Sequence, residues 1–187
     1  MKNIVRLSGE KVNLTVLRTD DEAKELYMKW MSNETTALYI EKNDVVIEVS
    51  QMPQWLHDPS VFRMGIVDAA TDELVGYCHV DHRATQMAAW LSINIGAESA
   101  RGKGFGKDAV KIMCRWCFDD LGVNSVHADI LECNEPSKHT FASVGFTQTG
   151  IYRAHDFSDG EVRNWTHWDI VESEWRERYG YPEKRNE

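Results

Sequence analysis

The stretch Arg101-Gly102-Lys103-Gly104-Phe105-Gly106-Lys107 decides how the rest of this chain is interpreted. It joins a strand-like segment, residues 88–95, to a helical pattern that begins at Phe105. Glycines at such a junction let the backbone adopt positive φ and approach a ligand closely. The free N–H groups at a helix start favour an anion. The stretch therefore predicts a turn that binds a phosphate or pyrophosphate.

The glycine spacing excludes one phosphate-binding pattern and fits another. A Walker loop needs Ser or Thr after its lysine, but Asp108 follows Lys107. The dinucleotide fingerprint G-x-G-x-x-A matches Gly104, Gly106 and Ala109, although that fold expects βαβ units and antiparallel strands are expected before this turn. A glycine-rich turn before a capped helix, with no ligand, is the third alternative.

Hydrophobic periodicity places a run of strands before the turn and an alternation of strands and helices after it. We expect strands at residues 11–17, 61–67, 74–80, 88–95, 125–131, 146–153 and 162–171. We expect helices after Asp20, near residues 50–56, from Phe105 and at 135–144, and a charged, partly helical tail from Trp175. This order indicates a mixed α+β sheet with one parallel pair around the helix that follows the turn.

Length and composition indicate one globular domain, residues 1–187. Hydrophobic residues make up 42% and charged residues 27%, which argues against a disordered or fibrous chain. No apolar run approaches the roughly 18 residues of a membrane span, so no membrane partner is expected. The N-terminus lacks an apolar signal segment, which predicts a cytoplasmic protein.

Charge and cysteine content narrow the choice of partners. The 30 acidic and 21 basic residues give a net charge of −9, which argues against nucleic acid and favours a cationic ligand such as an amine. The four cysteines are expected to be free thiols in a reducing compartment. Cys114 and Cys117 have redox-motif spacing, but they lie in mid-helix, which favours core packing over redox or zinc chemistry.

Three segments along the chain carry a second, longer pattern. Arg101 to Gly106 fits Q/R-x-x-G-x-G/A, and Asn134 to Ser137, Phe141 and Gly145-Phe146 follow as N-x-x-S, an aromatic position and G-F. Together they resemble the acetyl-CoA signature of the GNAT N-acetyltransferases, and the C-terminal part is similar to the RimJ/RimL-like branch. The resemblance covers nearly the whole chain. It implies a mostly antiparallel sheet with a splayed parallel pair, flanked by helices.

The resemblance also implies an acetyl-CoA site with no metal. The backbone of Ile93, Asn94 and Ile95 would hold the pantetheine arm and the thioester carbonyl. Asn134 would hydrogen-bond the arm, although Asn there is also a common helix N-cap. The pyrophosphate would lie in the loop made of Arg101, Gly102, Lys103, Gly104, Phe105 and Gly106.

Acetyl transfer to an amine requires a base, because alkyl amines with a pKa of about 10.4 are protonated at neutral pH. Asp129 lies where some relatives carry a glutamate base, and an ordinary solvent-facing strand acid is the alternative. Glu34, Asp81 and Glu98 are further acids. The run from His79 to His82 contains two histidines and an aspartate, which suggests a metal cluster or, with better support, a strand end facing the acceptor.

One position departs from the family pattern. Many members have tyrosine, a general acid for the leaving thiolate, where this chain has Phe141. His139, Ser137, Cys133 or water would then act, or no acid is needed. We expect an N-acetyltransferase for a protein N-terminus, a polyamine or another cationic amine. A silent acyl-CoA-binding module and a dinucleotide-binding domain are the alternatives, and a homodimer is left open.

Overall fold

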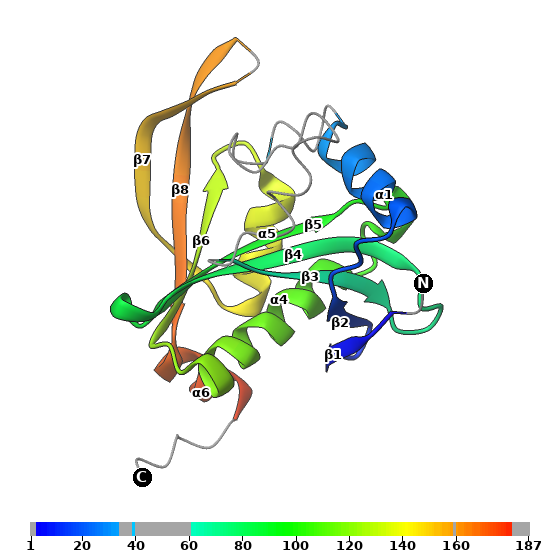
Figure 1. Cartoon of the computed structure of the whole chain (residues 1–187). Coiled ribbons are helices and arrows are strands. Elements are labelled where there is room, and N and C mark those ends of the chain that lie inside the picture. The colour runs from blue at the N-terminus through cyan, green and yellow to red at the C-terminus, as the bar shows by residue number, and fades with distance from the viewer. Residues whose placement is uncertain (1–2, 34–38, 40–60, 159, 181–187) are drawn as a thin grey trace. The chain divides into compact units, whose positions relative to one another are not determined.

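The computed structural model describes residues 3–33, 39, 61–158 and 160–180, and the helix expected at 50–56 lies outside them (Figure 1). The described strands form one sheet in the order β1-β2-β3-β4-β5-β6-β8-β7. They are Val5–Ser8 (β1), Val12–Val16 (β2), Val61–Asp68 (β3), Leu74–Arg83 (β4), Ala88–Ile95 (β5), Ser125–Leu131 (β6), Thr147–Ser158 (β7) and Glu161–Val171 (β8). The α-helices are Asp21–Met31 (α1), Phe105–Trp116 (α4), Glu135–Val144 (α5) and Glu172–Tyr179 (α6).

Strand directions confirm the mixed α+β sheet. Strands β5 and β6 pair in parallel, whereas β2 pairs antiparallel with β1 and β3, and β8 pairs antiparallel with β6 and β7. This topology differs from the repeated parallel βαβ units of a dinucleotide-binding domain, so that alternative is wrong. The chain divides into two compact units, Met1–Val80 with Ser92–Ile112 and Asp81–Leu91 with Met113–Glu187.

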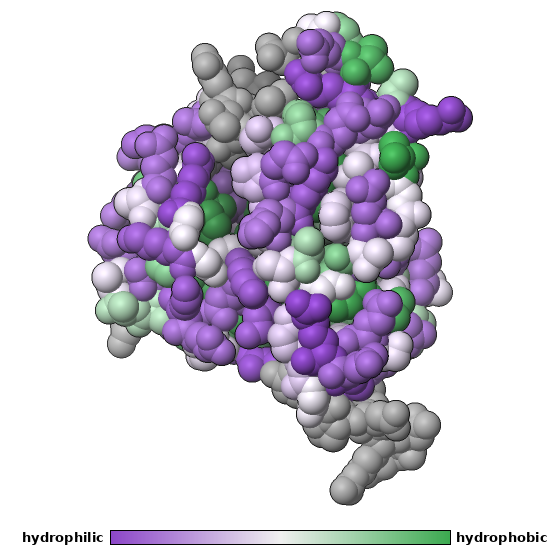
Figure 2. All heavy atoms as spheres, turned by 180° about the vertical axis from the view of Figure 1, so that it is seen from behind, coloured by the Kyte–Doolittle hydropathy of each residue, from purple (hydrophilic) through white to green (hydrophobic). Residues whose placement is uncertain are grey.

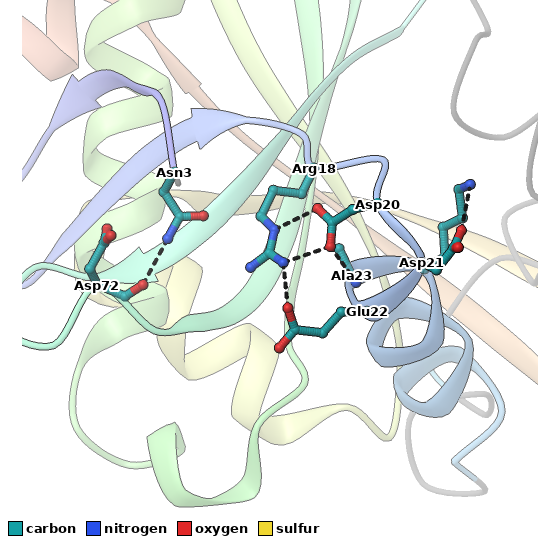
Figure 3. Close-up of polar contacts among 8 residues, drawn as sticks. Asn3, Arg18, Asp20, Asp21, Glu22, Ala23 and Asp72 are labelled. Carbon is teal, nitrogen blue, oxygen red and sulfur yellow. Dashed lines mark hydrogen bonds and ion pairs between the residues drawn. The ribbon is translucent and has the colours of Figure 1, made fainter. Parts of the chain in front are cut away.

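In the first unit, polar side chains cap and stabilise the N-terminus of α1 (Figure 3). Asp20 is the N-cap, and its Oδ1 accepts from the backbone N–H of Ala23 at 3.3 Å. The guanidinium of Arg18 donates to both carboxylate oxygens of Asp20, at 2.7 and 2.9 Å, and to Glu22 at 2.8 Å. The cation therefore holds the pKa of Asp20 well below its usual range. A cap of this kind satisfies a donor that the helix itself leaves open.

The core of the first unit forms where the apolar side of α1 packs. Residues three and four apart on a helix share a face, so Ala23, Tyr27 and Trp30 point the same way. Tyr27 meets Trp30 and Tyr77 edge to face, with ring centroids 6.0 and 5.8 Å apart. Burial raises the pKa of the Tyr27 hydroxyl. This packing fixes α1 against the strand that carries Tyr77.

In the second unit, α6 closes the core below the β7–β8 hairpin (Figure 1). Trp175 is 1% exposed, and its ring lies 5.8 Å from Phe118 and 4.2 Å from Tyr179. Tyr179 Oη donates to the carbonyl of Val144 at 2.9 Å, at the end of α5. The first part of the charged tail is therefore a packed helix that begins at Glu172, three residues before the expected start.

Several elements differ from the sequence expectation. Strand β1 was not expected, because its exposed residues show no clear alternation. Strand β7 runs to Ser158, past the expected end at 153, because a bulge between Tyr152 and Asp156 lets it continue. Ala154 has φ 51° within that bulge. Helix α4 ends at Trp116, and a π-helical turn then leads to Gly122, the expected stop.

The cysteines have the state and burial that the sequence predicts, and one face of the molecule is mainly polar. The face drawn in Figure 2 is largely hydrophilic, with small apolar patches between the polar side chains. None of the helices in the described part of the chain has the length and hydropathy of a membrane span. The four cysteines are free. Cys114 and Cys117 are fully buried, and burial raises the pKa of Cys117 to about 12, as core thiols require.

Candidate active site

The glycine turn of the first unit has the conformation that a phosphate cradle needs. Gly102 and Gly104 adopt φ 73° and 82°, values that favour glycine. Residues 101–104 are exposed, and the first helical bond of α4 runs from Asp108 N–H to the carbonyl of Gly104 at 3.1 Å. The N–H groups of the first helical turn thus lack intrahelical acceptors, as at every helix start. With exposed Arg101, Lys103 and Lys107 beside them, they fit an anionic diphosphate.

Two residues outside the turn hold it in place. Asp108 is 6% exposed, and its Oδ2 accepts from the backbone N–H groups of Lys11 and Val12, at 2.7 and 3.0 Å. Lys11 Nζ in turn donates to the carbonyl of Lys103 at 2.8 Å. A Cβ on Gly104 would lie 3.0 Å from that ammonium. The start of β2 and the turn before α4 therefore support one another.

The end of β5 leads into this turn within the same unit. Parallel pairing with β6 covers only Ala88–Trp90 against Ser125–His127, so residues 91–95 continue past the last pair. Asn94 Nδ2 donates to Tyr77 Oη at 3.2 Å, and Arg101 Nε donates to the carbonyl of Ile95 at 3.1 Å. The end of β5 is thus joined to the loop through Ile95 and Arg101.

Asn134 lies in the second unit, where it begins α5. Its Oδ1 accepts from the backbone N–H of Ser137 at 3.2 Å, which is the N-cap expected from the sequence. The cap uses the carbonyl oxygen and leaves the amide NH₂ to other partners. Phe141 lies further along the same helix. It is 2% exposed and packs edge to face on Phe146 at 4.9 Å, so its ring belongs to the core.

Asp129 is not an isolated strand acid. It lies opposite His167 in the β6–β8 ladder, and its Oδ1 accepts from His167 Nδ1 at 2.5 Å. Tyr152 Oη lies 3.2 Å from the same ring nitrogen. The Asp129 and His167 side chains are 20% and 17% exposed, so solvent reaches both. A carboxylate paired with an imidazole in this way can accept and pass on a proton.

The histidine pair extends further along β6. His127 Nδ1 lies 3.1 Å from His167 Nε2, and His127 Nε2 lies 2.7 Å from Ser125 Oγ. Burial and the neighbouring His167 lower the pKa of His127. The His127 ring stacks on Trp90 with centroids 4.4 Å apart. The imidazole is therefore held on both nitrogens and on one ring face.

The other acids proposed from the sequence are less well placed. Asp81 pairs with Arg83 at 3.1 Å, and Glu98 is exposed beside the glycine turn. Glu34 lies outside the described residues. The His79–His82 run does not form a ligand group in the described part of the chain, whereas a group of His127, His167 and Asp169 does. The metal-cluster interpretation of that run is therefore not supported in the described residues, and the favoured one, a strand end facing the acceptor, stays a prediction.

His127, His167 and Tyr152 were missed as site residues. Their sequence signal is the alternation His127–Asp129 on one strand and His167–Asp169 on another, which places each pair on one sheet face. That signal becomes informative only with the register of β6 against β8, which joins residues 38 positions apart. Pattern reading within one strand cannot supply it.

Comparisons with known proteins assign the family. The sequence model of the acetyltransferase (GNAT) domain matches residues 11–147. The chain is 28% identical over 139 residues to an alpha/beta-tubulin-N-acetyltransferase 9 of Drosophila melanogaster, which covers 66% of this chain and 70% of that protein. Two solved structures share the fold. Spermidine N-acetyltransferase from Vibrio cholerae, in complex with CoA and spermine, has a TM-score of 0.73 at 19% identity, over 88% of this chain and 98% of that chain.

Mycobacterium smegmatis RimJ, in complex with CoA-disulfide, has a TM-score of 0.75 at 18% identity, over 90% of this chain and 88% of that chain. At these identities the two structures show only the shared fold, and the match to the family model supports the activity. The eight-strand mixed sheet agrees with both. The chain therefore belongs to the GNAT family and is an acetyl-CoA-dependent N-acetyltransferase.

Proposed function

We propose that the chain acetylates a positively charged primary amine, such as a polyamine or a protein N-terminus. The net charge of −9 carries this proposal, because a negative field raises the local concentration of cations. The names of similar proteins agree with an amine of this class, since one is a spermidine enzyme and another a tubulin enzyme. No metal is assigned to the reaction in this proposal.

In this proposal, the glycine turn holds the pyrophosphate of acetyl-CoA mainly through backbone N–H groups. The exposed glycines and the open first turn of α4 support it. The backbone of residues 93–95 would hold the pantetheine arm, because β5 runs on beyond its last pair with β6. Asn134 would donate its amide NH₂ to the same arm. Acetyl-CoA supplies the activated acetyl group, and these residues orient it.

Asp129 is proposed as the base that takes the proton of the amine. Its Oδ1 is held by His167, so in this proposal Oδ2 accepts the proton. The adjacent imidazole orients this carboxylate, and Tyr152 Oη is a further neighbour of the same ring nitrogen. A positioned base contributes about 10²–10⁴ in rate.

Two measurements test the proposal. Asp129→Asn should lower kcat about 10²–10⁴-fold while the Kd for acetyl-CoA stays unchanged, whereas Asp120→Asn, an exposed acid of the same unit, should change neither. The kcat/KM for spermidine should fall as salt rises, because screening weakens steering. An amine of low pKa, uncharged at the assay pH, should respond little. An equal salt response for both amines would refute the preference for cations.

A further inference from the structure

Two histidines and an aspartate of the second unit face one another across β6 and β8. His127 pairs with Asp169 and Asp129 pairs with His167, two positions apart along the ladder, so the four side chains share one sheet face. His127, His167 and Asp169 each offer one ligand atom, and these atoms all lie within 4.8 Å of one another. His127 Nδ1 and His167 Nε2 are 3.1 Å apart. We propose that His127, His167 and Asp169 bind one divalent transition metal ion of the Zn²⁺ class.

The donor set and its spacing fit this ion. Imidazole nitrogen and carboxylate oxygen are common Zn²⁺ ligands, and three protein ligands leave a fourth position for water. Two ligands about 2.0–2.1 Å from a tetrahedral ion lie roughly 3.4 Å apart. The two ring nitrogens are 3.1 Å apart, so they are already near this separation. Asp169 supplies the third donor, a carboxylate oxygen within 4.8 Å of the other two ligand atoms.

Each ligand residue also has a hydrogen-bond partner on its other polar atom, which is the usual arrangement around a bound metal. Ligating histidines normally hydrogen-bond a carboxylate, carbonyl or water through the other ring nitrogen, and ligating carboxylates are hydrogen-bonded in turn. Here all three outer atoms have such a partner. The pairs are His167 Nδ1 with Asp129 Oδ1 (2.5 Å), His127 Nε2 with Ser125 Oγ (2.7 Å) and Asp169 Oδ2 with Thr149 Oγ1 (2.9 Å).

When no metal is bound, a proton on His127 Nδ1 can bridge the two ring nitrogens of the site. With His167 Nδ1–H donated to Asp129, the 3.1 Å contact requires His127 Nδ1–H to donate to His167 Nε2. Metal binding then moves the His127 proton from Nδ1 to Nε2. Ser125 Oγ can accept it there, because a hydroxyl both donates and accepts. No proton has to leave the protein, and the fold tolerates both states.

Local charge also suits a divalent cation. The carboxylates of Asp129 and Asp169 together match its two positive charges. Arg83 is the opposing cation, and its guanidinium lies 4.0 Å over the Trp90 ring and pairs with Asp81 at 3.1 Å. The Arg83 guanidinium thus contacts the Trp90 ring, and Trp90 in turn stacks on His127. The ion would therefore be close to electrically balanced.

The proposed metal site adjoins the proposed base, because Asp129 holds the ligand His167, but no step of acetyl transfer is assigned to the metal. Its test uses binding and spectroscopy on the full chain, purified without a histidine tag and stripped with EDTA. Calorimetry with ZnCl₂ should show a single ion bound per chain. Co²⁺ should give the intense visible absorption of four-coordinate cobalt, distinct from the weak absorption of the hydrated ion.

Variants separate the ligands from their supports. His127→Ala and Asp169→Ala should each weaken Zn²⁺ binding more than about 100-fold, and Thr149→Val should weaken it by roughly 10–100-fold as an outer partner. His155→Ala removes an exposed histidine of β7 outside the group and should leave the affinity unchanged. Circular dichroism checks that each variant folds.

Two results would overturn the proposal, and neither depends on enzyme activity. One is a native protein that binds Zn²⁺ no more tightly than His127→Ala. The other is native protein with Co²⁺ that keeps the weak spectrum of the hydrated ion, which needs no variant to fold. Asp129 is an outer partner of His167, so Asp129→Asn should weaken Zn²⁺ binding by roughly 10–100-fold. Native protein that binds Zn²⁺ tightly but acetylates no amine would overturn the proposed function and leave the metal site standing.

Discussion

Asp108 should contribute more to the free energy of unfolding than an exposed acidic residue of a helix does. Its Oδ2 takes two backbone N–H groups, from Lys11 and Val12, and the Val12 contact is buried. Asp108→Ala leaves both donors without their partner, at about 1–3 kcal/mol for each fully buried one. Water can reach the part-buried N–H of Lys11, so the combined loss should be about 2–4 kcal/mol. For a chain of this size that lowers Tm by about 4–15 °C.

Asp108→Asn is the matched control, because both bonds go to one oxygen. The amide oxygen of Asn can accept both N–H groups and loses only the charge, so it should cost about half as much. Thermal unfolding by circular dichroism gives all three Tm values under one condition. If Asp108→Ala melts within about a degree of the native protein, or if the Asn and Ala variants melt together, the role assigned to this oxygen is wrong.

Three further predictions concern single side chains. Gly104→Val should abolish acetyl-CoA binding in calorimetry, while Gly102→Ala, equally positive in φ but with nothing within 4 Å of the added Cβ, should retain part of it. Arg18 depresses the pKa of Asp20, so the ionised carboxylate stabilises the fold fully above about pH 4, and this stabilisation is lost as the pH falls further. The difference in Tm between the native protein and Asp20→Asn should therefore become smaller in acid. The native protein should transfer acetyl despite Phe141, because a thiol of pKa about 8.5 leaves readily. Phe141→Tyr should keep or raise the rate while lowering Tm, because the hydroxyl enters a core position.

The glycine turn and α4 could be predicted because their signals are local. Positive φ at Gly102 and Gly104 and a helical pattern from Phe105 are readable within a dozen residues. The parallel neighbour of β5 also followed from the order of elements. The C-terminal end of β7 could not be predicted, because the bulge that prolongs the strand depends on contacts with the facing strand. One such contact is the hydrogen bond from Ala154 N–H to Asn164 Oδ1, at 2.8 Å.

The histidine group shows why the rest could not be predicted. Asp129 was noticed as a single acid, but its meaning depends on His167, and their contact depends on which residue of β8 lies opposite. A register shift of one residue would turn the His167 side chain to the other face. The His79–His82 run suggests a cluster only because its members are close in sequence, and a strand end facing the acceptor is its favoured interpretation. Proximity along a chain is a poor guide to proximity across a sheet.

We propose above that this chain moves an acetyl group from acetyl-CoA to a cationic amine. The most direct measurement is the mass of the products after incubation with saturating acetyl-CoA and a panel of polyamines, basic peptides and uncharged amines. We expect a cationic amine to gain the mass of one acetyl group, and Gly104→Val to prevent this. Tight acetyl-CoA binding with no amine acetylated, together with transfer restored by Phe141→Tyr, would contradict the claim and identify a silent acyl-CoA-binding module.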